Sequence, residues 1–155
     1  MRAGEEDAVA ALVLRVFDEL VAPDVAAEGA EAFHTYADPV ELVARASEDH
    51  FVLLAVLGST IVGMIEVRRH EHVSLLFVER RRHGIARALL ERAVGLCREK
   101  RPDLDCVTVH SSPYAEPVYA RLGFRRSGRR RTEHGITYVP MTLELDAGWE
   151  GERSP

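Results

Sequence analysis

The chain has 155 residues, of which 46% are hydrophobic and 29% charged, and its formal net charge is −5 at pH 7. This length and composition are typical of one globular domain with a substantial core, and they argue against disorder except at the ends. The negative charge argues against binding to nucleic acid or anionic membranes, although arginines concentrate at 80–87 and 125–131. A local anion-binding site in an acidic protein is the interpretation that we favour.

The cysteines and the first residues of the chain indicate the cellular compartment of the protein. Cys97 and Cys106 fall in apolar helix and strand segments without CxxC spacing, which predicts neither a disulfide framework nor a zinc site. No apolar run approaches the length that spans a bilayer, and the acidic residues 5–7 do not resemble a signal peptide. We therefore expect a cytoplasmic protein without a membrane or nucleic-acid partner.

The first part of the chain predicts two helices with a looser stretch between them. An acidic start followed by apolar residues at helical spacing predicts a helix over Asp7–Leu20. Residues 21–37 contain a proline and a glycine, with a helical turn expected about Ala26–His34. A capping box that begins at Asp38, with proline at the first helical position, predicts a second helix over Pro39–Ser47.

Three strands are expected next. Phe51–Leu57 and Ile61–Val67 are apolar runs joined through Gly58 and Ser59, which predicts a tight hairpin of two antiparallel strands. A third run, Val73–Val78, leads into an arginine-rich turn.

The arginine-rich turn has the composition of a pyrophosphate cradle. It offers Arg81, Arg82 and Arg87 as cations and Gly84 where the backbone comes close to a ligand. The helix that follows, which ends near Lys100, adds the free N–H groups and positive dipole of its start. Taken alone, such a turn is more often a solvated basic edge, so the decision rests on the rest of the sequence.

The second half of the chain alternates strands and a helix. Leu104–His110 predicts a strand, Pro113–Leu122 a short helix and Ile136–Leu145 a last strand. The arginines within 125–131 are expected to form an exposed hairpin turn, although contact with an acidic acceptor or another subunit stays open. Residues 147–155 lack periodicity and are expected to form a flexible tail.

The helix after the arginine turn connects two strands in a βαβ crossover. Such crossovers make the strands parallel neighbours, here Val73–Val78 and Leu104–His110. Ligands bind at the C-terminal ends of parallel strands, and both Arg81 and Ser111 fall at those ends.

Two motifs in order point to a known family. Arg81-x-x-Gly84-x-Ala86 matches Arg/Gln-x-x-Gly-x-Gly/Ala after a strand, and residues 112–124 match Asn-x-x-Ala followed by Tyr-x-x-x-Gly-Phe. Over roughly Val9 to Leu145 the chain resembles the GNAT superfamily of acetyl-CoA-dependent N-acetyltransferases.

The resemblance implies a fold and an activity. The implied fold is α/β (α+β): a central mixed, mostly antiparallel sheet with a parallel βαβ crossover and flanking helices, in one domain over residues 1–146. The implied activity is transfer of an acetyl group from acetyl-CoA to a primary amine by direct attack in a ternary complex. The acceptor is then a small-molecule or peptide amine, and an exposed late strand is compatible with a homodimer.

The resemblance also assigns the cofactor-binding residues. Backbone groups of Leu76, Phe77 and Val78 are expected to pair with the pantetheine amides, and an N–H of this strand to polarise the thioester carbonyl. N–H groups of residues 82–87 are expected to hold the pyrophosphate. The implied set is completed by Arg81, Arg82, His83, Gly84, Ile85, Ala86, Arg87, Ser112 and Tyr119.

Catalysis needs an acid and a base. Tyr119 lies where the family often keeps a general acid, and a phenol with a pKa of about 10 protonates a thiolate with a pKa of about 8.5 only with help from positioning. The amine must also lose a proton, for which Glu66, near the end of its strand, and His72, just before the next strand, are candidates. His70 and His72 have no third ligand in register, so no metal site is expected.

The sequence departs from the family pattern at two places. The first strand is reduced to about Met1–Ala3, so that edge of the sheet is in doubt. Ser112 stands where many members have asparagine, and its shorter side chain predicts a weaker or water-mediated bond to the pantetheine arm.

Two other classes of function stay open. A module that binds acetyl-CoA or CoA without transferring an acyl group would keep residues 81–87 but lack a working acid or base. A nucleic-acid-binding domain would use both arginine clusters, but 6% aromatic residues and the net charge argue against it. The acceptor pocket is expected from about Phe17–Tyr36 and Arg126–Tyr138, whose sequence does not identify the amine.

Overall fold

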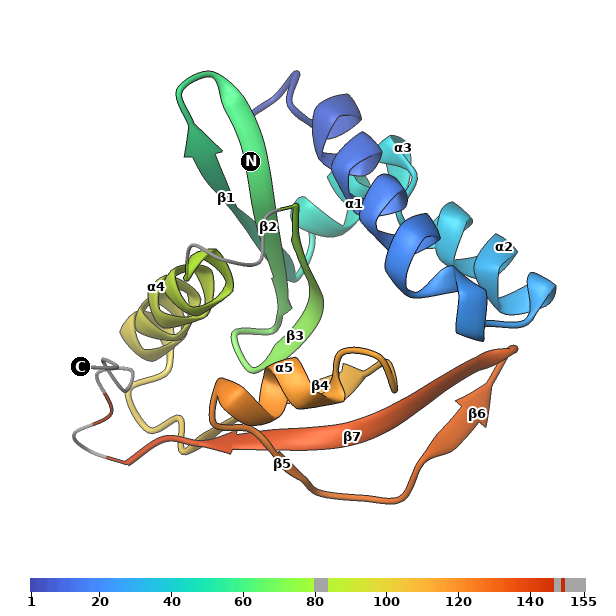
Figure 1. Ribbon diagram of the computed structural model, residues 1–155. Helices are drawn as coiled ribbons and strands as arrows, with labels where there is room; N and C mark the ends of the chain where they lie inside the picture. The colour runs from blue at the N-terminus through green and yellow to red at the C-terminus, as the bar shows by residue number, and fades with distance from the viewer. Residues whose placement is uncertain (80–83, 147–148, 150–155) are drawn as a thin grey trace.

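A mixed sheet separates two groups of helices in the computed structural model, which describes residues 1–79, 84–146 and 149 (Figure 1). The strand order is β1-β2-β3-β4-β7-β5, with β6 also paired to β7, and β3–β4 is the parallel pair. The strands are β1 His50–Leu57, β2 Thr60–Arg68, β3 His72–Val78, β4 Cys106–Ser111, β5 Arg125–Arg126, β6 Arg131–Glu133 and β7 Ile136–Glu144. The helices are α1 Glu6–Leu20, η1 Ala22–Asp24, α2 Ala27–Tyr36, α3 Pro39–Ala46, α4 Ile85–Lys100 and α5 Glu116–Arg121. The expected fold class is confirmed.

The local signals in the sequence account for most of these elements. The Asp38 carboxylate accepts a hydrogen bond from the Val40 N–H at 2.9 Å, which caps α3 where the capping box predicted. Gly58 has a φ of 63° in the hairpin turn between β1 and β2. The turn expected at Ala26–His34 is a full helix, α2, and α5 is shorter than predicted because residues 113–115 form a turn before it.

The described residues before α1 form no strand. The amino group of Met1 instead donates a hydrogen bond of 2.8 Å to the carbonyl oxygen of Val52 in β1. Where the family pattern has a first strand, this chain therefore has a backbone contact from Met1 to the outer edge of β1.

The core lies on both faces of the sheet. Helices α1 and α3 bury residues such as Leu12 and Leu42 against Met64 on one face. Helices α4 and α5 pack on the other face, against side chains that include those of β4 and β7. Gly63 lets α4 approach the sheet closely, because a Cβ built there would lie 3.0 Å from a methyl carbon of Ile85.

The parallel pair holds the two halves of the sheet together over a short distance. Only His72 with Thr108 and Val73 with Val109 are in register between β3 and β4 among the described residues. Beyond them the strands diverge, as Figure 1 shows. The opening lies at the C-terminal ends of the two strands, where the crossover predicted space for a ligand.

The late arginines are exposed, as expected, but they do not form a hairpin turn of their own. Arg125 and Arg126 lie in β5 and Arg131 in β6, and both short strands pair with β7. The turn of the hairpin is instead at residues 134–135, between β6 and β7. The predicted tail at 147–155 falls outside the described residues except for Trp149, which packs against the α4 side of the core.

Candidate active site

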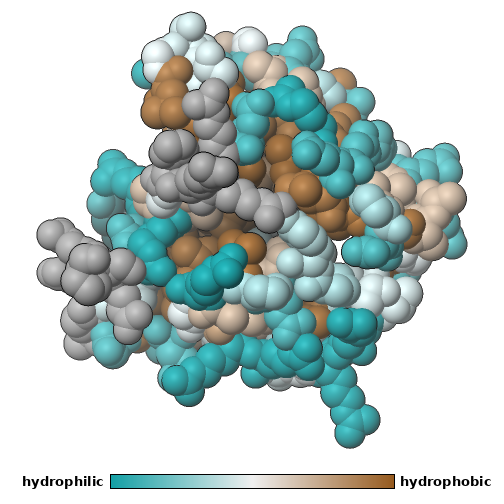
Figure 2. Space-filling view, viewed as in Figure 1, coloured by the Kyte–Doolittle hydropathy of each residue, from teal (hydrophilic) through white to brown (hydrophobic). Residues whose placement is uncertain are grey.

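A cavity of about 450 Å³ opens where β3 and β4 diverge. Its walls come from α1, η1 and α2 on one side, from β3 and the start of α4 on another, and from the end of β4, α5 and β7 on the third. Figure 2 shows hydrophobic residues at the floor of the hollow and hydrophilic residues around its rim. The volume is in the range of sites for small ligands, which is about 300–1,000 Å³.

One edge of β3 is available to a ligand. Leu76, Phe77 and Val78 line the cavity, as do Ser74 and Leu75. On its other edge β3 pairs with β2 as far as Val78, but toward β4 the described pairing stops at Val73. Backbone N–H and C=O groups of residues 74–78 therefore face the opening on one side of the strand, and an extended amide-containing ligand is able to pair with them.

The start of α4 forms the next part of the cavity. Gly84, Ile85, Ala86 and Arg87 line it. Gly84 precedes the helix with φ 62° and ψ 18°, a left-handed conformation that favours glycine, and a Cβ built there meets no atom within 4 Å. The open space and the helix start together fit an anionic group. Arg81, Arg82 and His83 of the predicted cradle lie outside the described residues.

Arg87 connects the start of α4 to α5. Its Nη2 donates a hydrogen bond of 2.9 Å to the carbonyl oxygen of Arg121, and both arginines line the cavity. Among the described residues that line the cavity, Arg87 and Arg121 are the arginines, and there is no lysine. The wall formed by α4 and α5 is therefore the cationic one.

Tyr119 and Ser112 line the cavity beside this wall. Tyr119 is 7% exposed and packs edge-to-face on Phe124 at 5.4 Å between ring centroids. Burial raises the pKa of the Tyr119 phenol, which keeps it protonated and able to donate. The Ser112 hydroxyl accepts a hydrogen bond of 3.2 Å from the Ala115 N–H, so it also stabilises the turn before α5.

Glu66 lies behind the cavity and does not line it. Its side chain is 0% exposed and pairs with Arg45, whose Nε lies 3.1 Å from Oε1. The Tyr36 hydroxyl donates to the same carboxylate at 3.3 Å, and the Arg45 guanidinium stacks 3.6 Å from the centroid of the Tyr36 ring. The structure therefore places the first candidate base in an ion pair between β2 and α3.

His72, the second candidate base, reaches the cavity only through another histidine. Its Nδ1 lies 2.7 Å from Thr108 Oγ1, and its ring meets the ring of His110 edge-to-face at 4.8 Å. Burial lowers the pKa of His72 to about 4, and the nearby His110 adds to the effect. His70, by contrast, lies in the turn between β2 and β3 with a φ of 58°, against Phe51.

His110 lines the cavity, and the sequence reasoning did not select it. It follows Val109, the last residue of β4 in register with β3, so it stands where the strands begin to diverge. Its ring stacks on Tyr138 at 4.3 Å, and burial lowers its pKa, which favours the neutral imidazole. His110 could have been predicted from its place at the C-terminal end of the crossover strand. The same argument placed Ser111 near a ligand.

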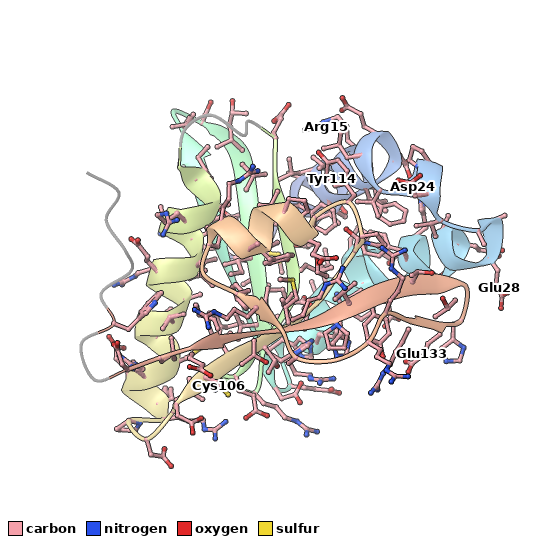
Figure 3. All side chains as sticks on the ribbon, turned by 60° about the horizontal axis from the view of Figure 1, so that its bottom comes forward. Arg15, Asp24, Glu28, Cys106, Tyr114 and Glu133 are labelled. Carbon is pink, nitrogen blue, oxygen red and sulfur yellow. The ribbon has the colours of Figure 1, made fainter. Side chains whose placement is uncertain are left out.

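The far end of the cavity is apolar. It is lined by Val16, Phe17, Leu20, Val21, Val25, Phe33 and Ile136. Phe17 and Phe33 stack with their centroids 3.9 Å apart and an interplanar angle of 13°. In Figure 3, Tyr114, which also lines the cavity, lies on the segment before α5, on the side of helix α1. The expected acceptor segments of the sequence thus do contribute to the cavity, at the end away from α4.

Residues 1–79, 84–146 and 149 contain no group of three or more histidine, cysteine or acidic side chains arranged to hold a metal ion. Within the same residues, every helix is too short or too polar to cross a membrane.

Solved structures share this architecture. A GCN5-related N-acetyltransferase from Rhodopseudomonas palustris has a TM-score of 0.80 at 22% identity, covering 94% of this chain and 92% of that one. The PaiA N-acetyltransferase of Thermoplasma acidophilum, solved with coenzyme A, has a TM-score of 0.76 at 16% identity, covering 94% and 96%. A GNAT-family acetyltransferase from Staphylococcus aureus has a TM-score of 0.72 at 15% identity, with the same coverage. At these identities the likeness shows the fold.

Sequence comparison assigns the family. A UPF0039 protein of Schizosaccharomyces pombe is 30% identical over 67 residues, which is 43% of this chain and 45% of that relative, so the match spans less than half of the relative's length. The family model of the acetyltransferase (GNAT) domain matches residues 21–145, which is most of the chain. The chain therefore belongs to the GNAT family of acetyltransferases.

Proposed function

We propose that the protein transfers an acetyl group from acetyl-CoA to a primary amine. One observation carries the proposal: the free edge of β3 at residues 74–78 runs through a cavity that ends at the start of α4. That arrangement suits a long ligand with backbone-like amides and an anionic end, which is the chemistry of coenzyme A. The structural relative from Thermoplasma acidophilum, solved with coenzyme A, supports the same assignment.

The residues of this chain fit such a cofactor. Leu76, Phe77 and Val78 would bind the pantetheine amides through their backbone groups, with Ser112 on the opposite wall. Gly84 and the first N–H groups of α4 would hold the pyrophosphate, with the predicted contribution of residues 81–83 beside them. When bound, the cofactor supplies an acetyl group activated as a thioester.

The remaining residues would move protons. The neutral ring of His110, at the point where the strands diverge, would accept a proton from the amine, with His72 and Thr108 fixing the ring behind it. An N–H of β3 would stabilise the negative charge that develops on the carbonyl oxygen. Tyr119 would donate a proton to the departing sulfur, and because burial raises its pKa, that donation must accompany C–S cleavage.

Calorimetry with acetyl-CoA tests the cofactor site. Gly84→Glu should abolish binding, because its carboxylate repels the pyrophosphate. Gly84→Ala is the matched control, since it introduces the same backbone strain at a φ of 62° but adds only an uncharged methyl group. It should weaken binding far less than Gly84→Glu. Equal binding by the parent and Gly84→Glu, or no binding by a folded parent, would contradict the proposal.

Turnover then separates an enzyme from a binding module. Tyr119→Phe should keep the Kd for acetyl-CoA and lower kcat by about 100-fold, the lower end of what one proton-transferring group contributes. Tight binding of acetyl-CoA with no release of free thiol in the presence of a broad set of amines would favour the non-catalytic module instead.

A further inference from the structure

We infer that the acceptor is a primary monoamine that carries an aromatic or branched aliphatic group. The group would occupy the apolar end of the cavity, between α1, η1, α2 and β7. The inference rests on the proposed function, because it names the acceptor class of that same site.

The walls of this end are built for an apolar group. Phe33 stacks on Phe17 and lies 5.7 Å from the ring of Phe77, so three aromatic rings form a continuous surface. Leu20 and Val25 extend that surface, and their side chains are only partly buried by the protein itself. An apolar group bound against them removes this surface and its own from water, which favours binding.

The charges along the cavity exclude acceptors with several charges. Within the described residues no aspartate or glutamate lines the cavity, and the arginines, Arg87 and Arg121, lie at the cofactor end. A polyamine or an aminoglycoside would bring additional ammonium groups into the apolar end without partners, which is strongly unfavourable. A free amino acid would likewise bring a carboxylate to a wall that has no cation.

One polar edge borders the apolar end, and it suits a single ammonium group. The Tyr138 hydroxyl donates to Glu133 Oε1 at 3.0 Å, and the Tyr138 ring stacks on His110. Figure 3 shows Glu133 with Asp24 and Glu28 along the end of the molecule formed by η1, α2 and the β6–β7 hairpin. Asp24 and Glu28 are exposed and do not line the cavity, so Glu133, bound to the cavity residue Tyr138, is the carboxylate that would attract the ammonium group at this edge, and His110 would take its proton.

The polar edge formed by Glu133, Tyr138 and His110 favours an amine, and not a longer acyl chain, as the occupant of the apolar end. An acyl chain has no charge for Glu133 and no proton for His110, whereas an ammonium uses both. In the transfer, the C–N bond forms while the C–S bond breaks, and the ammonium loses two protons. The sulfur receives one proton through Tyr119, and the other leaves to solvent through His110.

Steady-state rates with acetyl-CoA test the acceptor class. Phenethylamine should have a kcat/KM about 10- to 100-fold above that of ethylamine, as expected for burial of a ring-sized group, and far above that of putrescine. Leu20→Glu should reverse the preference toward putrescine, because it places a carboxylate in the apolar wall. Leu20→Gln is the matched control of equal size without charge, and it should lower the rate with phenethylamine without raising that with putrescine.

Measuring amine binding as well as turnover separates a failure of the inference from a failure of the proposed function. Phenethylamine should also bind by calorimetry to the protein saturated with CoA, and putrescine should not. Faster turnover of putrescine than of phenethylamine, no binding of phenethylamine, or a preference for hexanoyl-CoA over acetyl-CoA with ethylamine would each overturn the inference. No binding of acetyl-CoA would instead overturn the proposed function itself.

Discussion

Gly29 and Gly135 bring two distant segments into backbone contact. A Cβ built on Gly29 would lie 2.3 Å from the carbonyl oxygen of Gly135, and one built on Gly135 would lie 2.8 Å from the nitrogen of Gly29. Gly29 lies in the first turn of α2, and Gly135 lies in the turn between β6 and β7 with a φ of 78°. The contact joins the helix and the hairpin that wall the apolar end of the cavity.

Gly29→Ala should disturb the acceptor end of the cavity. The new methyl group has no room beside the Gly135 carbonyl, so the hairpin must move away from α2, at a cost of about 1–3 kcal/mol. We expect a lower free energy of unfolding by urea denaturation and a raised KM for the amine, with an unchanged Kd for acetyl-CoA. A weaker affinity for acetyl-CoA with an unchanged amine KM would show that this contact does not shape the acceptor end.

Gly95→Ala is the matched control for a glycine in a helix. Gly95 is exposed in α4, and a Cβ built there meets no atom within 4 Å. The substitution should therefore raise the free energy of unfolding by about 0.5–1 kcal/mol, because alanine loses less backbone entropy on folding. Its kinetic constants should equal those of the parent.

Arg45→Met should destabilise the protein strongly. It would leave Glu66, which is 0% exposed, as a buried carboxylate without its cation, at a cost of about 3–5 kcal/mol. The double variant Arg45→Met with Glu66→Leu should recover much of the loss, because it removes both charges together. Urea denaturation of the two single variants and the double variant measures this coupling, and additive losses would show that the pair is not coupled.

The sequence predicted the elements that frame the cavity better than the contacts of the candidate side chains. The two motifs located β3, the start of α4 and Tyr119, because local spacing encodes a strand, a turn and a helix. The partner of Glu66 was not predictable in the same way, since Arg45 lies on α3 and meets β2 only through the tertiary fold.

The sequence named Glu66 and His72 as candidate bases and not His110, because which histidine lines the cavity depends on strand register. Alternation along a strand says which residues share a face, but it does not say at which residue two parallel strands stop pairing. Here pairing stops at Val73 and Val109, which leaves His72 behind the junction and His110 in the cavity. The contact of Gly29 with Gly135 was hidden for a similar reason, because a close approach between a helix and a hairpin turn leaves no periodic pattern.

His72 should make the protein less stable in mild acid. Its pKa is about 4 in the folded protein and about 6.5 when unfolded, so over that interval the unfolded chain binds more protons. The free energy of unfolding should therefore be fully retained above pH about 6.5 and fall as the pH decreases toward about 4. Urea denaturation across this range checks it, and His72→Gln should show a shallower fall, because glutamine does not titrate. Parallel curves for the two proteins would exclude His72 as a source of the acid sensitivity.

The pH dependence of kcat/KM should identify the base. Burial lowers the pKa of His110, so the ring is neutral at neutral pH and the rate should fall only below its ordinary pKa of about 6.5. Glu133 acts in the opposite direction and raises that pKa, so Glu133→Gln should move the acidic limb to still lower pH. His110→Asn should remove the limb and lower kcat by about 100- to 10,000-fold with an unchanged Kd for acetyl-CoA. If His110→Asn keeps the parental limb, another group accepts the proton and His110 only shapes the wall.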